Sequence, residues 1–238
     1  GTNEAEQTGA IDLGEAPELS GTGTTPIVLD AAKVPNVMTL PGSPATFQVT
    51  IAGWANVLEN RNGNEFFSNL DPVAELGLAF GWRDNGAGTA LVEARLGNGT
   101  TVASFGTPAF SAASFVGQPY CWILTWNADT DASGRGRLRI YRGRLGIATL
   151  LQQWTVAAAT DPLWLSGADF VIGERMDNPT PGTNAARYAR AIVDRVSIFY
   201  SELSATAINT LHACRTTGGH DWTPHDDPEF DIVCSRCG

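Results

Sequence analysis

Residues 120–146 read YCWILTWNADTDASGRGRLRIYRGRLG. Two runs in this segment place an apolar residue at every second position, on either side of a polar stretch that contains two glycines. The apolar positions are Trp122, Leu124, Trp126, Leu138 and Ile140. Side chains two residues apart share one face of a strand, so each run predicts a strand with one face on a core. The segment therefore predicts an antiparallel hairpin with its turn near residues 133–134.

The same alternation extends in both directions along the chain. It recurs at Phe47, Val49 and Ile51, and at Val196, Ile198 and Tyr200. Turn-forming Asn, Asp and Gly residues separate the runs, at residues 62–63, 84–86 and 97–99. Many short strands joined by such turns, with almost no helical periodicity, predict an all-β, two-sheet antiparallel sandwich or jelly roll.

One short helix is predicted near the end of this region. Ser204 is suited to cap it, because its hydroxyl can accept a backbone N–H of the first turn. Leu203, directly before the cap, can pack on Ile208 as a hydrophobic staple, and Leu211 falls on the same face. The helix closes a β domain that we place at residues 26–211.

The first 25 residues form an acidic arm. They contain five carboxylates and no Lys or Arg, and the first basic residue of the chain is Lys33. Gly and Thr make up much of the rest, without a period of 2 or 3.6. A segment of this composition buries too little apolar surface to fold by itself. Residues 1–25 are therefore interpreted either as a solvated tail or as an arm that becomes ordered against a neighbouring subunit.

The end of the chain carries a Cys/His pattern typical of a structural metal site. Cys214 and His220 form a C-x5-H pair, and Cys234 and Cys237 form a C-x2-C pair. Three thiolates and one imidazole fill a tetrahedral Zn²⁺ shell and leave no position for an activated water. The pattern predicts one zinc ion that folds a tail of residues 212–238, which has too few large apolar groups for a core of its own.

Alternatives to this ligand set stay open. His225 or His212 can replace His220 as the fourth ligand. A disulfide within the C-x2-C pair would form a very small ring and would leave the other two ligands unexplained. The remaining cysteine, Cys121, sits alone in an apolar run and is interpreted as a buried small hydrophobe in a protein from a reducing compartment.

The charge balance argues against several partner classes. Only 17% of the residues are charged, and the formal net charge is −10. An acidic chain is repelled by nucleic acid and by anionic membranes, so neither is expected as a partner. The sequence has no apolar run long enough to span a bilayer and no basic-then-apolar leader, which favours a protein made in the cytoplasm.

Candidate catalytic groups are sparse. No closely spaced Glu/Asp pair lies in an apolar strand, as glycoside hydrolysis would require, and no Gly-x-Ser-x-Gly elbow is present. All three histidines lie at residues 212–238. The polar alternation from Asn127 to Ser133 resembles a calcium loop, but Ala132 and Leu138 stand where such a loop has Gly and Glu. We therefore expect no enzymatic activity.

Seven Trp residues are candidate surfaces for stacking against sugars. Trp122 and Trp126 share one strand face and are predicted to fill the core. The roles of four others, which lie near turn residues, stay open between core and ligand contact. These four are Trp54, Trp82, Trp154 and Trp164.

The closing part of the domain, residues 170–211, reads FVIGERMDNPTPGTNAARYARAIVDRVSIFYSELSATAINTL. It resembles the end of concanavalin A-like jelly rolls of the laminin-G-like type, where a strand ending in Ile-Gly precedes a strand of the form (I/V)DxVxIFxxxLS and a short helix. The matching residues are Ile172, Gly173, Val193, Asp194, Val196, Ile198, Leu203 and Ser204. Residues 47–57 and 120–146 fall where that family places its front strands and its Trp-bearing hairpin. The resemblance covers about residues 28–211 and implies a concanavalin A-like sandwich.

The function implied by this resemblance is broad, since the fold hosts lectins, glucanases and structural modules, and the glucanase carboxylate motif is absent here. The tail is similar to short terminal zinc modules of tailed-bacteriophage proteins. Together these features predict a structural or decoration protein on the outer surface of a phage particle, capsid or tail, made in the host cytoplasm. The expected partners are other virion proteins and further copies of the chain in a homo-oligomer. The alternative is a lectin-like module that binds surface glycans for host attachment.

Overall fold

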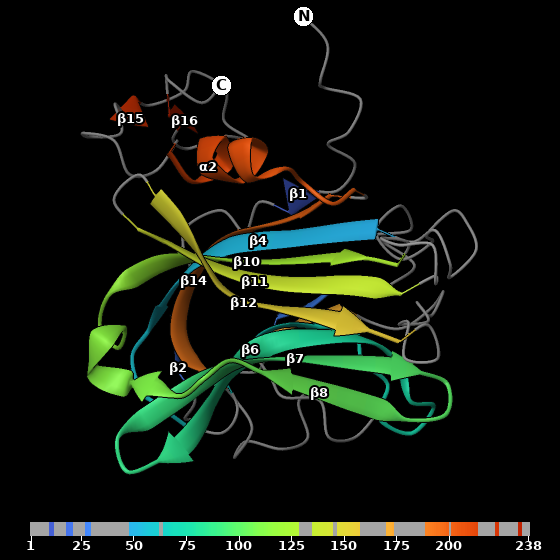
Figure 1. Cartoon of the computed structure of the whole chain (residues 1–238). Coiled ribbons are helices and arrows are strands. Elements are labelled where there is room, and N and C mark those ends of the chain that lie inside the picture. The colour runs from blue at the N-terminus through green and yellow to red at the C-terminus, as the bar shows by residue number, and fades with distance from the viewer. Residues whose placement is uncertain are drawn as a thin grey trace, which may run out of the picture.

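The chain is described by a computed structural model at residues 10–11, 18–20, 27–29, 48–61, 64–128, 135–144, 147–157, 170–173, 189–199, 201–213, 222–223 and 233–234. In this part of the chain, two antiparallel sheets face each other with the hydrophobic core between them, and helix α2 lies outside (Figure 1). No helix among the described residues is long and apolar enough to cross a membrane. The predicted all-β, two-sheet antiparallel architecture is confirmed.

The first sheet, called sheet A, has the strand order β1-β14-β4-β10-β11-β12, and β2 also pairs with β14. Its strands are β1 (Ala10–Ile11), β2 (Glu18–Ser20), β4 (Gln48–Val57), β10 (Pro119–Asn127), β11 (Gly136–Arg144), β12 (Ile147–Val156) and β14 (Arg190–Phe199). Strands β10 and β11 form the predicted hairpin, in which Trp126 stands opposite Leu138 and Leu124 opposite Ile140. The apolar positions of both strands therefore share one face, as the alternation indicated.

The second sheet, called sheet B, has the order β3-β13-β5-β6-β7-β8, and β9 also pairs with β7. Its strands are β3 (Ile27–Leu29), β5 (Asn64–Ser68), β6 (Leu76–Gly86), β7 (Thr89–Asn98), β8 (Val102–Gly106), β9 (Phe110–Ser111) and β13 (Phe170–Ile172). The β6–β7 turn was predicted at residues 84–86 but lies at residues 87–88. Strand β6 continues to Gly86 through a bulge, where the Asp84 carboxylate accepts the Gly86 N–H at 2.9 Å.

Large aromatic side chains join the two sheets. Trp122 and Trp126 are fully buried, which confirms their predicted place in the core. Trp82 of sheet B meets Trp122 of sheet A edge to face, with 5.2 Å between ring centroids. Each such side chain contributes about 2–3 kcal/mol when fully buried, so these rings anchor one sheet on the other.

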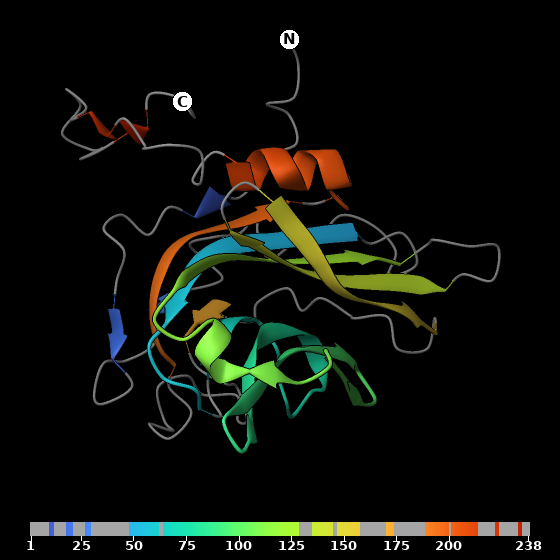
Figure 2. The same ribbon diagram turned by 60° about the vertical axis from the view of Figure 1, so that its left-hand side comes forward.

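The outer face of sheet A is also partly buried, which the alternation did not predict. Helix α2 (Ala205–Ala213) lies on this face (Figure 2). Ile208 of α2 packs with Cys121, Ile123 and Tyr141, which project from β10 and β11 on the side away from the main core. Cys121 is thus buried as predicted, but it lies beneath the helix and not between the sheets.

The start of α2 follows the predicted capping pattern. The Ala207 N–H donates to the Ser204 hydroxyl at 3.1 Å, and the Ile208 N–H donates to the Ser204 carbonyl at 2.9 Å. Leu203 packs against the same small cluster as Ile208, as a staple requires. These contacts fix the direction of the connection between β14 and α2, which determines where the side chain of Glu202 lies.

Three short N-terminal strands extend the sheets at their edges. β1 and β2 pair with β14, and β3 pairs with β13. Two pieces of the predicted acidic arm therefore add to a sheet of their own chain. The rest of residues 1–25 lies outside the described residues, so the arm's boundary and its order against a neighbouring subunit stay predictions.

Candidate functional site

Strand β11 carries an unusual density of positive charge for an acidic protein. Four of the fifteen Lys and Arg residues of the chain lie in its nine residues. Arg137 and Arg139 alternate with the core residues Leu138 and Ile140, so they project from the outer face of sheet A. Arg142 and Arg144 have the parity of the core residues and project toward the space between the sheets at the other end of the strand. The two pairs meet different surroundings.

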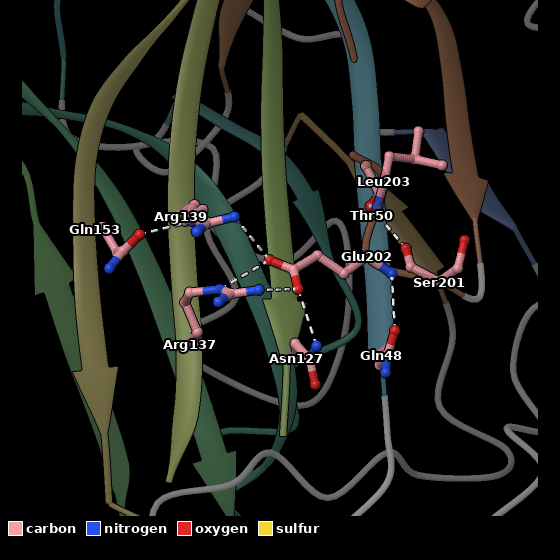
Figure 3. Close-up of polar contacts among 9 residues, drawn as sticks. All are labelled: Gln48, Thr50, Asn127, Arg137, Arg139, Gln153, Ser201, Glu202 and Leu203. Carbon is pink, nitrogen blue, oxygen red and sulfur yellow. Dashed lines mark hydrogen bonds and ion pairs between the residues drawn. The ribbon is translucent and has the colours of Figure 1, made fainter. Parts of the chain in front are cut away.

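The first pair surrounds one carboxylate. Arg137 donates through Nε to Glu202 Oε1 at 3.0 Å and through Nη2 to Oε2 at 2.5 Å, and Arg139 Nη1 donates to Oε1 at 3.2 Å. Asn127 Nδ2 adds a fourth bond, to Oε2, at 2.9 Å. Figure 3 shows the Glu202 carboxylate pointing into this ring of donors from β10 and β11. We call these four residues the Glu202 clamp.

The electrostatics of the clamp favour the charged forms. Burial by itself raises the pKa of Glu202, but hydrogen bonds from Arg137 and Asn127, with the charge of Arg139, outweigh it and hold that pKa below its ordinary value. The hydrogen bond to Glu202 raises the pKa of Arg137. The carboxylate side chain is only 8% exposed, against 30% for Arg137 and 25% for Arg139. Such a shielded, bidentate pair is stronger than a surface ion pair.

The clamp holds the chain segment that leads into α2. The Thr50 hydroxyl donates to the Ser201 carbonyl at 2.7 Å and accepts the Leu203 N–H at 3.0 Å. The Glu202 N–H donates to Gln48 Oε1 at 3.2 Å (Figure 3). Backbone and side chain of residues 201–203 are therefore fastened to β4, β10 and β11 together. The geometry indicates a structural role for Arg137 and Arg139.

The second pair of arginines lies where the chain crosses from sheet B to sheet A, between β9 and β10. The Arg142 guanidinium carbon is 4.8 Å from the ring centroid of Tyr120 and 5.6 Å from that of Phe110. The Arg144 guanidinium carbon is 5.4 Å from the same Tyr120 centroid. All four side chains are half-buried. We call Phe110, Tyr120, Arg142 and Arg144 the crossover cluster.

The aromatic rings of this cluster are held firmly. Tyr120 packs on Trp122 with 5.7 Å between centroids, and its hydroxyl donates to the Ser114 carbonyl at 3.0 Å. Phe110 meets the buried Phe115 edge to face at 5.4 Å. The short 3-10 turn η3 (Ala112–Ser114) connects β9 to β10 on this side. The aromatic rings of Phe110 and Tyr120 are therefore held in place and form an apolar surface against the two guanidinium groups.

A third charged group lies on the outer face of sheet B. Glu65 of β5 stands opposite Gly81 of β6, which stands opposite Glu93 of β7. Two strand spacings separate the two glutamates, about 10 Å between their Cα atoms. Arg95 forms an ion pair with Glu65, and Arg83 Nη1 lies 3.2 Å from Glu93 Oε1. Sequence patterns did not predict this carboxylate row, because its members come from different strands.

The predicted zinc ligands fall largely outside the described residues. Cys214, His220 and Cys237 are not described, and no metal-binding group occurs among the residues that are. Cys234 lies in β16 (Val233–Cys234), which pairs with β15 (Trp222–Thr223) so that Cys234 stands opposite Trp222. Cys234 is therefore paired with a strand that begins two residues after His220 in the sequence. Of the alternative ligands, His212 lies in α2, and His225 lies outside the described residues.

No protein-family model matches the sequence, and no curated protein matches it. Among solved structures, the chain is similar to the CBM40 domain of the Ruminococcus gnavus IT-sialidase, with 15% identity, a TM-score of 0.56, and coverage of 83% of this chain and 96% of that domain. It is also similar to a heptameric SAP-like pentraxin from Limulus polyphemus, with 16% identity, a TM-score of 0.54, and coverage of 87% and 83%.

A third similar structure is of botulinum neurotoxin type C, whose cell entry is described as dependent on two ganglioside molecules. The identity is 15%, the TM-score 0.53, and the match covers 86% of this chain but only 46% of the other. The chain thus spans about half of that structure. These likenesses establish the fold, and they are consistent with the concanavalin A-like sandwich that residues 170–211 implied.

Proposed function

We propose that this chain is a non-enzymatic, lectin-like module that binds glycans, and that the crossover cluster is its binding site. The observation that carries the proposal is the pairing of half-buried aromatic rings with two arginines on one rigid corner of the sandwich. A sugar offers an apolar C–H face and a rim of polar groups. Tyr120 and Phe110 supply a surface for the first, and Arg142 and Arg144 supply donors for the second.

The similar structures support a binding role. The CBM40 domain of the Ruminococcus gnavus sialidase is recorded bound to α2,3-sialyllactose, with a TM-score of 0.54 to this chain. A host-attachment module would use this capacity on cell surfaces. The sequence left glycan binding as the alternative to a structural role, and these similar structures favour glycan binding over a purely structural role.

The carboxylate row of sheet B favours binding over hydrolysis. A glycosidase needs one carboxyl group that gives a proton to the leaving oxygen and a second that acts as base or nucleophile. Glu65 and Glu93 are each engaged by a guanidinium, from Arg95 and Arg83. Incubation with oligosaccharides should therefore release no reducing ends. Release that disappears in a Glu93→Gln variant would instead make the chain a hydrolase.

Binding can be tested on a glycan array followed by calorimetric titration of the best ligands. We expect dissociation constants in the micromolar to millimolar range. A Phe110→Ala variant should weaken binding by at least tenfold. Phe105→Ala is the matched control, because Phe105 is also half-buried but contacts Trp154 at another edge of the sandwich. An array without any reproducible signal would reject the function.

The particle that carries the module is a second proposal. The similarity of the tail to terminal zinc modules of phage proteins supports a place on the outer surface of a virion, capsid or tail, among other virion proteins and further copies of the chain. The acidity of the chain suits an outer surface, away from packaged DNA. Co-purification with assembled particles is the expected result. Recovery only as free protein would contradict it.

We further propose that Cys214, His220, Cys234 and Cys237 hold one structural zinc ion that folds residues 212–238. The pairing of β15 with β16 supports this, since it folds the chain back so that Cys234 stands opposite Trp222. Bound zinc would supply folding free energy to a tail that lacks a core. Metal analysis should give one zinc per chain, lost in a Cys234→Ser/Cys237→Ser variant whose sandwich stays folded. Wild-type protein without zinc would reject the site.

A further inference from the structure

Arg142 and Arg144 have different partners from the arginines that form ion pairs in the described part of the chain. Arg83, Arg95, Arg137, Arg139 and Arg190 each meet a Glu carboxylate. In the described part of the chain, Arg142 and Arg144 meet no carboxylate, and their contacts are with aromatic rings. Both positively charged guanidinium groups contact the ring of Tyr120. Among the described residues, the crossover cluster therefore carries two positive charges without a carboxylate partner, on a chain of net charge −10.

A carboxylate in the same region is already engaged. Phe110 stands opposite Ala90, and Ala90 stands opposite Asp84, so the three residues form one row across β9, β7 and β6. Asp84 Oδ1 accepts Asn60 Nδ2 at 2.8 Å and the Gly86 N–H at 2.9 Å. These bonds hold Asp84 at the β6–β7 turn. Among the described residues, neither guanidinium group of the cluster has a carboxylate partner, which leaves its N–H donors for a group from outside the chain.

We propose that the crossover cluster recognises acidic glycans, with Arg142 and Arg144 holding a carboxylate of the sugar while Tyr120 and Phe110 contact its ring. This proposal rests on the glycan-binding function proposed above. Guanidinium groups bind carboxylates through two parallel N–H···O bonds, which a flexible ammonium group cannot do. Both guanidinium carbons lie within 5.4 Å of one ring centroid, so a single monosaccharide can meet both arginines.

The net charge of the protein restricts the kind of anion. A polyanion such as nucleic acid meets the repulsion of the whole acidic chain, which a local charge of two does not overcome. A sugar with one isolated carboxylate meets the local attraction and little of the long-range repulsion, because screening limits it to about 8–10 Å at physiological salt. The expected ligand is therefore an oligosaccharide with a terminal or isolated acidic residue.

Calorimetric titrations with matched oligosaccharides test the proposal. Three probes share one neutral core, and they carry no charge, a carboxylate, or a sulfate. We expect the carboxylated probe to bind at least tenfold more tightly than the neutral core, and 0.5 M NaCl to reduce this preference. Arg142→Gln and Arg144→Gln should abolish the preference and leave weak binding of the neutral core. Arg139→Gln is the control, since Arg139 belongs to the Glu202 clamp, and it should keep the preference.

Each of the other possible results of these titrations rejects a specific part of the proposal. Equal binding of the neutral and carboxylated probes would reject the acidic ligand but keep the glycan-binding function. Preference for the sulfated probe over the carboxylated one would reject carboxylate as the recognised group. A preference that survives in Arg142→Gln and Arg144→Gln would reject the site. Failure of all three probes, and of the array, would reject the proposed function together with this inference.

Discussion

The two ends of strand β11 carry the same residue type in opposite roles. Arg137 and Arg139 share the buried carboxylate of Glu202, which fastens the segment leading into α2 onto sheet A (Figure 3). Arg142 and Arg144 lie over the rings of the crossover cluster, and among the described residues they share no carboxylate. An arginine that is bound to a carboxylate of its own protein stabilises the fold. An arginine held over an aromatic ring keeps donors for a ligand.

This contrast separates two kinds of surface charge that composition alone treats as equal. The clamp should matter mainly for stability and the crossover cluster mainly for binding. Substitutions that remove one charge at each end of β11, measured for both stability and binding, therefore test the contrast. The expected losses of stability fall in the order Glu202, Ser204, Arg142.

The largest effect is expected for Glu202→Gln. The substitution leaves two arginines facing each other without a carboxylate, in a site where the side chain of residue 202 is 8% exposed. Removing one partner of a shielded ion pair costs about 2–4 kcal/mol of unfolding free energy. Urea denaturation at pH 7 measures it. Glu59→Gln is the control, since Glu59 pairs with Arg190 at the surface and should change stability by less than about 0.5 kcal/mol.

The clamp also predicts a pH dependence of stability. The pKa of Glu202 is below its ordinary value of 4.5 in the folded protein, so the unfolded chain takes up this proton first as the pH falls. The stabilisation is complete above about pH 4.5 and is lost progressively as the pH falls through the lower folded pKa. The difference in unfolding free energy between wild type and Glu202→Gln should therefore shrink below pH 4.5. A constant difference down to pH 2 would contradict the clamp.

The sequence predicted those features that depend on neighbouring residues. The hairpin of β10 and β11 follows from local alternation, and the start of α2 follows from Ser204 and Leu203. The burial of Ile123 was missed, because alternation marks it as outward and only the return of α2 across sheet A covers it. Periodicity reports which residues share a face. It does not report what lies on that face.

The charged groups were missed for a related reason. Glu202 meets Arg137 and Asn127 across 65 and 75 residues of chain, a contact that depends on the whole topology. Glu65 and Glu93 come together only through the pairing of three strands. For Arg142 and Arg144 a local signal existed: the adjacent apolar residues Ile140 and Tyr141 interrupt the alternation, and the arginines that follow have core-face parity.

A smaller effect on stability is expected for Ser204→Ala, which removes the cap of α2. The hydroxyl accepts the Ala207 N–H at 3.1 Å, and the loss of such a cap costs about 1 kcal/mol. Ser204→Gly should cost only a few tenths of that, because glycine is itself tolerated at a cap position. Equal losses for the two variants, measured by denaturation, would mean that the clamp and not the cap fixes the start of the helix.

The smallest effect on stability, together with the largest effect on binding, is expected for Arg142→Gln. A cation over an aromatic ring at a half-exposed site contributes about 0.5–1 kcal/mol, and relief of the repulsion from Arg144 offsets part of the loss. We therefore expect a change of less than about 1 kcal/mol in the free energy of unfolding. If Arg142→Gln destabilises the protein as much as Glu202→Gln does, both ends of β11 have structural roles. The proposal that the crossover cluster binds a ligand would then be rejected.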